Sequence, residues 1–188
     1  MSVVGKLCHH FTASSRVLVY KSGGVHLVYK ARRGEETTVT FAWGSNAKDL
    51  DICTYWLDAQ DNKVGYGWQY HTAGIYQEYP AKVDGVDYII GYNGDYRDTN
   101  DSEWIKVRKT DWTKGSNVLR IHLNFHDYDA IQYPDTSVTV IAVQSGSQTL
   151  TANVTTNQRN GKAFATDPYV EVTFDTAGRL TGLTSSTS

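Results

Sequence analysis

Short runs of β-branched and aromatic residues, each closed by a turn signal, constrain the fold of this chain more than any other feature. In residues 37–43, Val39, Phe41 and Trp43 alternate with Thr or Ala, so they would share one buried face of a strand. No stretch shows a long apolar period of 3.6 residues. Because short strands at regular spacing are typical of sandwiches, we predict an all-β fold, an antiparallel β-sandwich with little or no helix. The other predicted strands are residues 16–21, 25–30, 52–57, 63–68, 86–90, 103–108, 117–125, 137–143, 148–156 and 169–174.

Length and composition fit a single folded domain. The chain has 188 residues, of which 40% are hydrophobic. We expect the sandwich to occupy residues 16–182, with residues 1–15 as an N-terminal arm or peripheral strand and residues 183–188 as a Ser/Thr tail. Residues 69–87, which contain several Tyr, would form a long aromatic loop with one short strand. Trp43, Trp56 and Trp104 would lie in the core.

Charge and hydropathy exclude several classes of partner. The net charge of −2 gives no reason to expect nucleic-acid binding, and no apolar run is long enough to span a bilayer. Residues 1–20 lack the pattern of a secretory signal peptide, so we expect a cytoplasmic protein, or a virion protein if a phage encodes it. Cys8 and Cys53 are then expected as free thiols, with Cys53 buried in a strand.

Two acidic clusters point to a metal ion. Asp49 and Asp51 stand two residues apart in a predicted strand, so their carboxylates would project from one face and repel each other. Residues 91–103 place four more carboxylates in a loop rich in Gly and Asn. Carboxylate oxygens are the ligands that Ca²⁺ prefers, although the spacing is not that of an EF-hand. The predicted calcium ligands are Asp49, Asp51, Asp95, Asp98, Asp101 and Glu103.

Four aromatic residues form a candidate surface for a ligand or a partner. Trp68, Tyr70, Tyr76 and Tyr79 lie at or in the predicted loop. Exposed aromatic rings stack on sugars or anchor protein partners, but they also cover the ends of sandwiches, and both interpretations stay open. The chain lacks a phosphate-binding loop and a nucleophile elbow, and nothing fixes the separation of a catalytic carboxylate pair. We therefore expect no enzyme.

Residues 21–145 follow the motif order of a known protein family. The order is Lys21-Ser-Gly-Gly-Val25, the strand 37–43, the run DLDICTYWLDAQDNKV, the run GDYRDTNDSEWIKV and a strand ending in FHDYDA. This order resembles the TerD family, the bacterial tellurium-resistance and stress-response proteins. Its members carry a KGG hairpin, a DLD strand, a GDN loop that ends in acidic residues, and a strand that ends in a His-Asp pair.

The resemblance implies a calcium-binding β-sandwich with no established catalysis. Asp49 and Asp51 match the DLD acids, and Asp95 matches the Asp of GDN. Asp101 and Glu103 match the acids that end the loop, whereas His126 and Asp127 match the His-Asp pair and would lie beside the ion's ligands. The chain departs from the family pattern at Tyr96, which replaces the GDN asparagine, at Arg97, in residues 69–88 and after about residue 146.

We therefore expect a non-enzymatic, calcium-binding module that binds protein partners or assembles with itself. Two alternatives remain. One is a structural assembly protein, such as a head-decoration or tail component of a bacteriophage virion. The other is a carbohydrate-binding module that uses the aromatic residues of 68–79.

Overall fold

The computed structural model describes residues 17–21, 24–28, 36–44, 49–67, 76–94, 102–125, 135–146, 148–156 and 167–186. These residues form thirteen strands, and none of them lies in a helix. The prediction of an all-β fold is confirmed. The chain divides into two units, Met1–Gly34 and Glu35–Ser188, which we describe separately.

The first unit contains the predicted hairpin. β1 (Val17–Lys21) pairs antiparallel with β2 (Gly24–Val28), and the register begins with Lys21 opposite Gly24. A short turn containing Gly between two β-rich runs is a standard signal for such a hairpin. The sequence prediction had included this hairpin in the sandwich, whereas it belongs to a separate unit of the chain.

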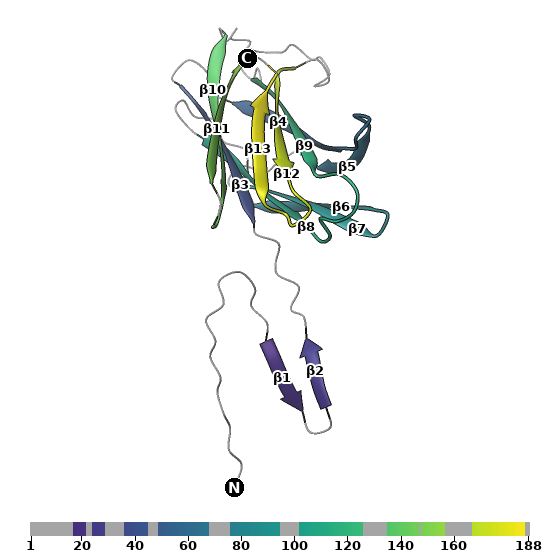
Figure 1. Ribbon diagram of the computed structural model, residues 1–188. Helices are drawn as coiled ribbons and strands as arrows, with labels where there is room; N and C mark the ends of the chain where they lie inside the picture. The colour runs from purple at the N-terminus through teal and green to yellow at the C-terminus, as the bar shows by residue number, and fades with distance from the viewer. Residues whose placement is uncertain are drawn as a thin grey trace. The chain divides into compact units, whose positions relative to one another are not determined.

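The second unit is a sandwich of two antiparallel sheets, whose arrangement is shown in Figure 1. Sequential strands often lie in different sheets, so residues far apart in sequence face each other across the core. The six-stranded sheet has the order β11 (Thr149–Thr156), β10 (Thr136–Gln144), β3 (Thr37–Trp43), β8 (Ser102–Lys109), β7 (Val86–Tyr92) and β6 (Gln77–Val83). The five-stranded sheet has the order β13 (Leu180–Ser185), β12 (Tyr169–Phe174), β9 (Val118–Phe125), β4 (Leu50–Leu57) and β5 (Lys63–Gly67).

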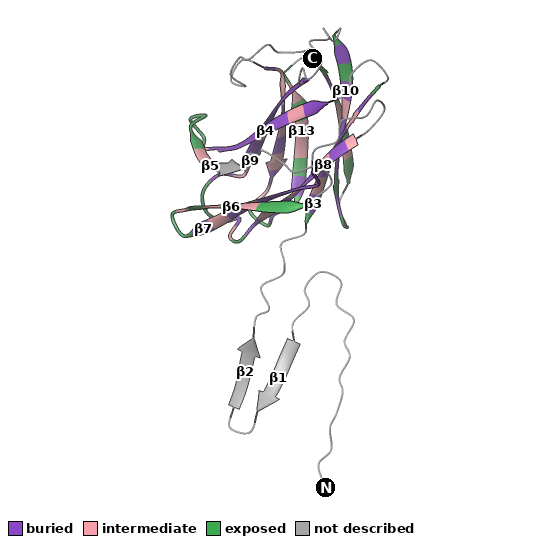
Figure 2. Ribbon diagram, turned by 180° about the vertical axis from the view of Figure 1, so that it is seen from behind, coloured by how far each residue is buried: buried purple, intermediate pink, exposed green. Residues whose placement is uncertain are grey.

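The core is built from alternate residues of the central strands, which appear as buried segments in Figure 2. Trp56 is fully buried and lies at the centre of an aromatic cluster. Its ring centroid is 5.1 Å from Tyr88, 6.0 Å from Trp112 and 6.1 Å from Phe174. Burying a large apolar side chain stabilises a fold by about 1.5–3 kcal/mol. Trp43 is also buried, so the core prediction is confirmed for both of these tryptophans.

Strand β8 carries a charged residue on its inner face near each end. Glu103, Ile105, Val107 and Lys109 alternate as the buried residues of this strand. Trp104 is one residue out of phase with them and lies half-buried on the outer face. The prediction that Trp104 belongs to the core is therefore wrong, because strand periodicity outweighs the hydrophobicity of a single residue.

The region expected to be a long aromatic loop with one short strand contributes the strand β6 and the turn of a hairpin. β6 and β7 pair over seven positions, from Gln77 opposite Tyr92 to Val83 opposite Val86. Asp84 and Gly85 form the turn, with φ values of +49° and +79°. These left-handed values suit a two-residue hairpin turn, for which Asp-Gly is a preferred pair. Pro80 is tolerated because β6 is an edge strand.

The sandwich also extends further toward the C-terminus than expected. β13 pairs with β12, from Leu180 opposite Phe174 to Ser185 opposite Val170. Leu180 is buried, which anchors the strand on the core. Residues 183–185, predicted as part of a Ser/Thr tail, thus belong to an edge strand of the five-stranded sheet.

Candidate functional site

One end of the sandwich is defined by an aromatic contact between the two sheets. Trp43 ends β3 and Phe125 ends β9, and their ring centroids lie 6.5 Å apart. Leu50 pairs with Phe125, and Ser102 pairs with Ala42. Strands β4 and β8, which belong to opposite sheets, therefore both begin at this end, which we call the acidic end.

Three of the predicted calcium ligands lie at or next to the acidic end. Asp49 directly precedes β4 and is 3% exposed, and Asp51 is half-buried opposite Asn124. Glu103 is fully buried on the other sheet and accepts a hydrogen bond from the hydroxyl of Tyr92. A buried carboxylate is costly unless hydrogen bonds, cations or metal ions compensate its charge. The donor set at this end consists of carboxylate oxygens, which fit a hard cation such as Ca²⁺.

The described carboxylates do not form a complete metal site by themselves. Within the described part of the chain, no three His, Cys, Asp or Glu side chains come close enough together to hold a metal ion. The remaining predicted residues, Asp95, Asp98, Asp101, His126 and Asp127, lie outside the described residues. A calcium site at the acidic end would therefore take further ligands from residues 95–101, which follow β7 and precede β8.

A connected set of polar side chains, which the sequence did not reveal, lies on the outer face of the five-stranded sheet. Two rows run across β4, β9 and β12, and a third joins β4 and β9, because residues in register share a face. Arg120 donates hydrogen bonds to Glu171 at 2.9 and 2.5 Å, and the side chain of Asn124 donates to Asp167 at 3.0 Å. The rows are Asp51–Asn124, Cys53–His122–Tyr169 and Tyr55–Arg120–Glu171.

The middle row holds a buried thiol and a buried imidazole. Cys53 is a free cysteine whose thiol donates to the hydroxyl of Tyr55 at 3.0 Å, as expected for a buried reduced cysteine. Burial raises the pKa of Cys53 to about 11, so its thiol stays protonated at neutral pH and is not a ready nucleophile. His122 Nδ1 lies 3.1 Å from the backbone oxygen of Asp167. Because a carbonyl can only accept, Nδ1 carries the proton.

Of the four predicted surface aromatics, the structure describes two. Tyr76 is 41% exposed and stacks on Trp104, with ring centroids 5.8 Å apart and an interplanar angle of 27°. Its hydroxyl donates to Glu78 at 3.0 Å. Tyr79 packs against the core instead, so it does not share this surface. Trp68 and Tyr70 lie outside the described residues.

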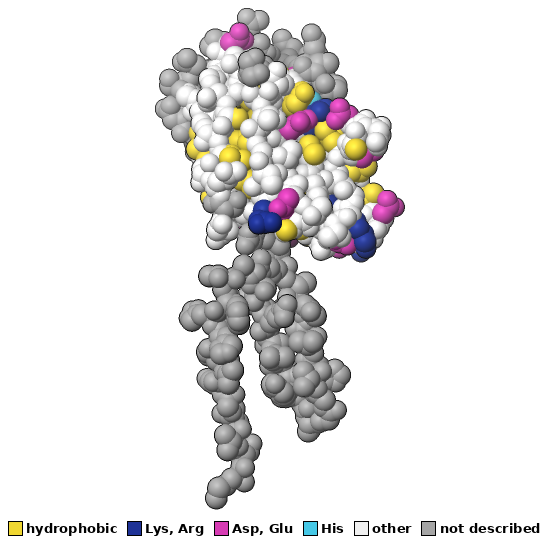
Figure 3. Space-filling view, in the orientation of Figure 1, with side chains coloured by type: hydrophobic (Ala, Val, Ile, Leu, Met, Phe, Trp, Pro, Cys, Tyr) yellow, Lys and Arg dark blue, Asp and Glu magenta, His cyan; other side chains and the backbone are white. Residues whose placement is uncertain are grey.

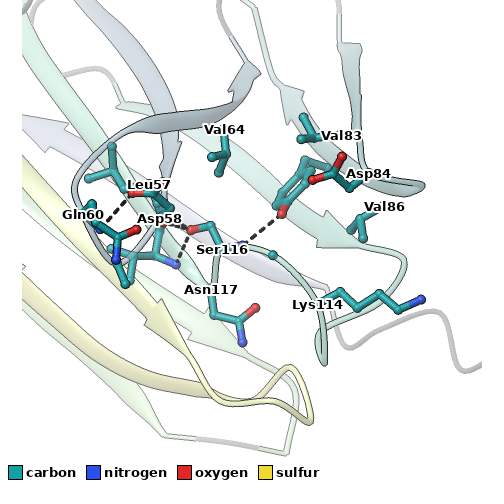
Figure 4. Close-up of a pocket in the computed structure, with 14 residues that line it drawn as sticks. Leu57, Asp58, Gln60, Val64, Val83, Asp84, Val86, Lys114, Ser116 and Asn117 are labelled. Carbon is teal, nitrogen blue, oxygen red and sulfur yellow. Dashed lines mark hydrogen bonds between the residues drawn. The ribbon is translucent and has the colours of Figure 1, made fainter.

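A pocket of about 610 Å³ lies between the two sheets at the end opposite to the acidic end (Figure 4). The β4–β5 turn, the β6–β7 turn and the β8–β9 connection enclose it, and its walls are mainly apolar. Tyr88 accepts a hydrogen bond from the Ser116 backbone N–H at 3.0 Å, and the Ser116 hydroxyl donates to the Leu57 carbonyl. This volume falls within the range of small-molecule sites. The sequence could not reveal the pocket, because three turns distant in sequence form it.

Lys109 holds the β8–β9 connection beside this pocket. It is 4% exposed, and its ammonium donates to the backbone oxygens of Lys114 and Ser116 at 2.5 Å and to Asn117 Oδ1 at 2.7 Å. The ammonium also lies 4.9 Å from the ring centroid of Tyr88. Burial lowers the pKa of Lys109 to about 8. The three acceptors use all three donors of the charged form, so this lysine has a structural role.

No protein-family model matches the chain, and no curated protein or solved structure matches it either. The resemblance to the TerD family therefore rests on the order of motifs alone. The described residues include no helix that is long and apolar enough to cross a membrane.

Proposed function

We propose that this chain is a non-enzymatic, calcium-binding β-sandwich module that resembles the TerD stress-response proteins. The observation that supports the proposal is the position of Asp49 and Glu103. These two buried carboxylates come from opposite sheets and lie at the same end of the sandwich. Residues 95–101, which include Asp95, Asp98 and Asp101, connect β7 to β8 in the sequence, and Tyr92 of β7 pairs with Ile105 of β8 near that end.

In this proposal, calcium joins the two sheets at the acidic end. Because Asp49, Asp51 and Glu103 are not close enough together to hold an ion, no more than two of them would bind it, together with Asp95, Asp98 and Asp101. The ion would offset the electrostatic repulsion among these carboxylates. Bringing negative charges together costs free energy in the absence of the ion. Binding therefore adds directly to the stability of the folded state.

The test is a thermal melt with excess Ca²⁺, with a chelator, and with Mg²⁺ in place of Ca²⁺. At a free calcium concentration of 100 Kd, binding contributes about 2.7 kcal/mol, which raises the Tm by roughly 5–10 °C for a domain of this size. Asp51→Asn should reduce both the calcium affinity and this rise in Tm. Asp84→Asn is the matched control, because Asp84 is exposed in a turn beside the pocket at the opposite end. An unchanged Tm with calcium, or equal effects of both substitutions, contradicts the proposal.

A structural assembly protein is the second candidate, and the charge distribution favours it. Strands β10, β11 and β13 contain no Asp, Glu, Lys, Arg or His. In Figure 3, the surface over β11 shows uncharged polar and hydrophobic atoms, and the described charged side chains of this face lie elsewhere. Interfaces between proteins are depleted of charged residues at their centres, so this region fits a contact with another protein chain.

A further inference from the structure

The two sheets of the sandwich have four edge strands, and three of them carry features that hinder pairing with another strand. β6 contains Pro80, which lacks a backbone N–H, and Lys82, which pairs with Asp87. β5 has only five residues, and its register with β4 shifts near its start. The register of β13 with β12 also shifts, and this strand contains Gly182. Charge, proline, irregular register and short length are the usual protections of a sheet edge.

The fourth edge strand, β11, has none of these protections. Its eight residues contain no charged residue, proline or glycine, and it pairs with β10 at eight successive positions without a shift. Its other side pairs with no strand among the described residues. Four of its residues form an exposed row on the outer face, namely Thr149, Thr151, Asn153 and Thr155.

The outer face next to this edge is also suited to contact with protein. On β10, Val143 is 43% exposed, which makes it one of two large hydrophobic residues exposed in the described part of the chain. It lies directly opposite Thr149 of β11. An uncharged, regular edge that continues into an uncharged face offers both backbone hydrogen bonds and a flat contact surface.

We propose that β11 is a self-association edge, at which two copies of this chain pair antiparallel and join their six-stranded sheets into one. This inference specifies the surface for the assembly role and does not depend on calcium. A second copy is the occupant that the sequence of β11 fits, because the strand carries no charge and so does not repel itself. A strand with charges of a single sign would repel a second copy of itself.

The pattern of exposed and buried residues limits the registers that this pairing can take. A continuous sheet requires outer-face residues to stand opposite outer-face residues, so the two-fold axis must pass through a residue and not between two. With the axis at Ala152, Leu150 stands opposite Val154 of the second copy on the inner face. On the outer face, Thr151 stands opposite Asn153 of the second copy. Apolar residues then meet apolar ones, and polar residues meet polar ones.

A pair of double variants tests this register. Thr151→Lys with Asn153→Lys places like charges opposite each other across the axis, whereas Thr151→Lys with Asn153→Glu places opposite charges there. Both positions are exposed, and both variants remove the same exposed hydrogen bond from the Thr139 hydroxyl to Asn153, so the two variants should share one circular dichroism spectrum and one melting temperature. The mass in solution is measured by sedimentation velocity over a range of concentrations, in chelator, so that the result is separate from the calcium test.

The wild type should reach twice its monomer mass of 21.0 kDa. The Lys/Lys variant should dimerise at least about tenfold more weakly than the Lys/Glu variant. A wild type that stays monomeric overturns the proposal, as do equal dimer affinities of the two variants. Hydrogen exchange gives the reason if the protein is monomeric. Protection of all β11 amides in the monomer would mean that the edge is covered within one chain, which also overturns the proposal.

Discussion

Replacing Lys109 by Met should lower the free energy of unfolding of the sandwich by about 2–6 kcal/mol. Met keeps most of the length of the side chain but removes the ammonium group. The oxygens of Lys114, Ser116 and Asn117 then lose their donor, and they lie in a partly or fully buried environment. The change therefore tests whether this ammonium organises the β8–β9 connection.

The expected magnitude combines two opposing contributions. A hydrogen bond to a charged group contributes about 1.5–3 kcal/mol, so three of them represent roughly 5–9 kcal/mol. Against this, burial of the charge lowers the pKa of Lys109 from 10.5 to about 8. This shift corresponds to roughly 3 kcal/mol of unfavourable desolvation, which Met removes. The lost hydrogen bonds exceed the recovered desolvation, so the variant is less stable.

Urea unfolding at pH 7, followed by tryptophan fluorescence and by circular dichroism, measures this difference. Lys114→Met is the matched control, since Lys114 is 67% exposed and its ion pair with Asp111 is a surface contact. The control should change stability by less than about 0.5 kcal/mol. A Lys109→Met variant as stable as the wild type would show that the three acceptors are satisfied without this lysine, and the reasoning would be refuted.

Three further predictions concern pH, thiol reactivity and packing. The pKa of Lys109 is lower in the folded than in the unfolded protein, so the unfolded chain binds more protons between pH 8 and 9. The free energy of unfolding should therefore rise by about 1 kcal/mol over this range, as measured by urea unfolding at each pH. The Lys109→Met variant should lack this rise. The raised pKa of Cys53, together with its burial, should make alkylation of this thiol at pH 8 at least about 100-fold slower in the folded than in the unfolded protein, as measured by mass spectrometry of its peptide. Gly178→Ala should destabilise the sandwich by about 1–3 kcal/mol more than Gly146→Ala, because both glycines have positive φ but only at Gly178 would a Cβ lie 2.5 Å from the indole nitrogen of Trp112. Equal melting temperatures of the two glycine variants would contradict this account.

Local patterns in the sequence predicted most strands, but they did not predict every edge of the sheets. The alternation in residues 37–43 identified β3 because period two is a property of the strand itself. One short strand was expected within residues 69–87, but the bounds of β6 and its pairing with β7 were not predicted, because Pro80 and neighbouring tyrosines are typical of loops. Asp84-Gly85 is nevertheless a strong hairpin signal. β13 was missed because its Ser and Thr residues suggest a tail, and only pairing with β12 gives them a strand conformation.

The candidate sites depend on contacts that no local pattern encodes. The register of β4 with β9 and of β3 with β8 brings Asp49 and Glu103 to one end. The sequence had linked these two residues through the chemistry of acidic clusters and the order of motifs, neither of which gives their positions in space. The pocket and the contacts of Lys109 arise where three turns from both sheets meet. Sequence periodicity gives the face on which a side chain lies, but it does not give the residue that faces it from the other sheet.

The two inward charges of β8 have a consequence for how the chain finds its correct strand alignment. A register shift of β8 by one residue relative to its neighbouring strands is excluded by the alternating pattern, because it would turn Trp104 and the other outer residues into the core. A slip of two residues keeps every side chain on its proper face, so the alternating pattern does not oppose it. It would, however, place Glu103 or Lys109 in the apolar middle of the sheet. Glu103 would then lose its contact with Tyr92, or Lys109 its contact with Ser116, and a buried charge without its partner is costly. The buried charges near the two ends of β8 thus distinguish the native register from the registers that are shifted by two residues.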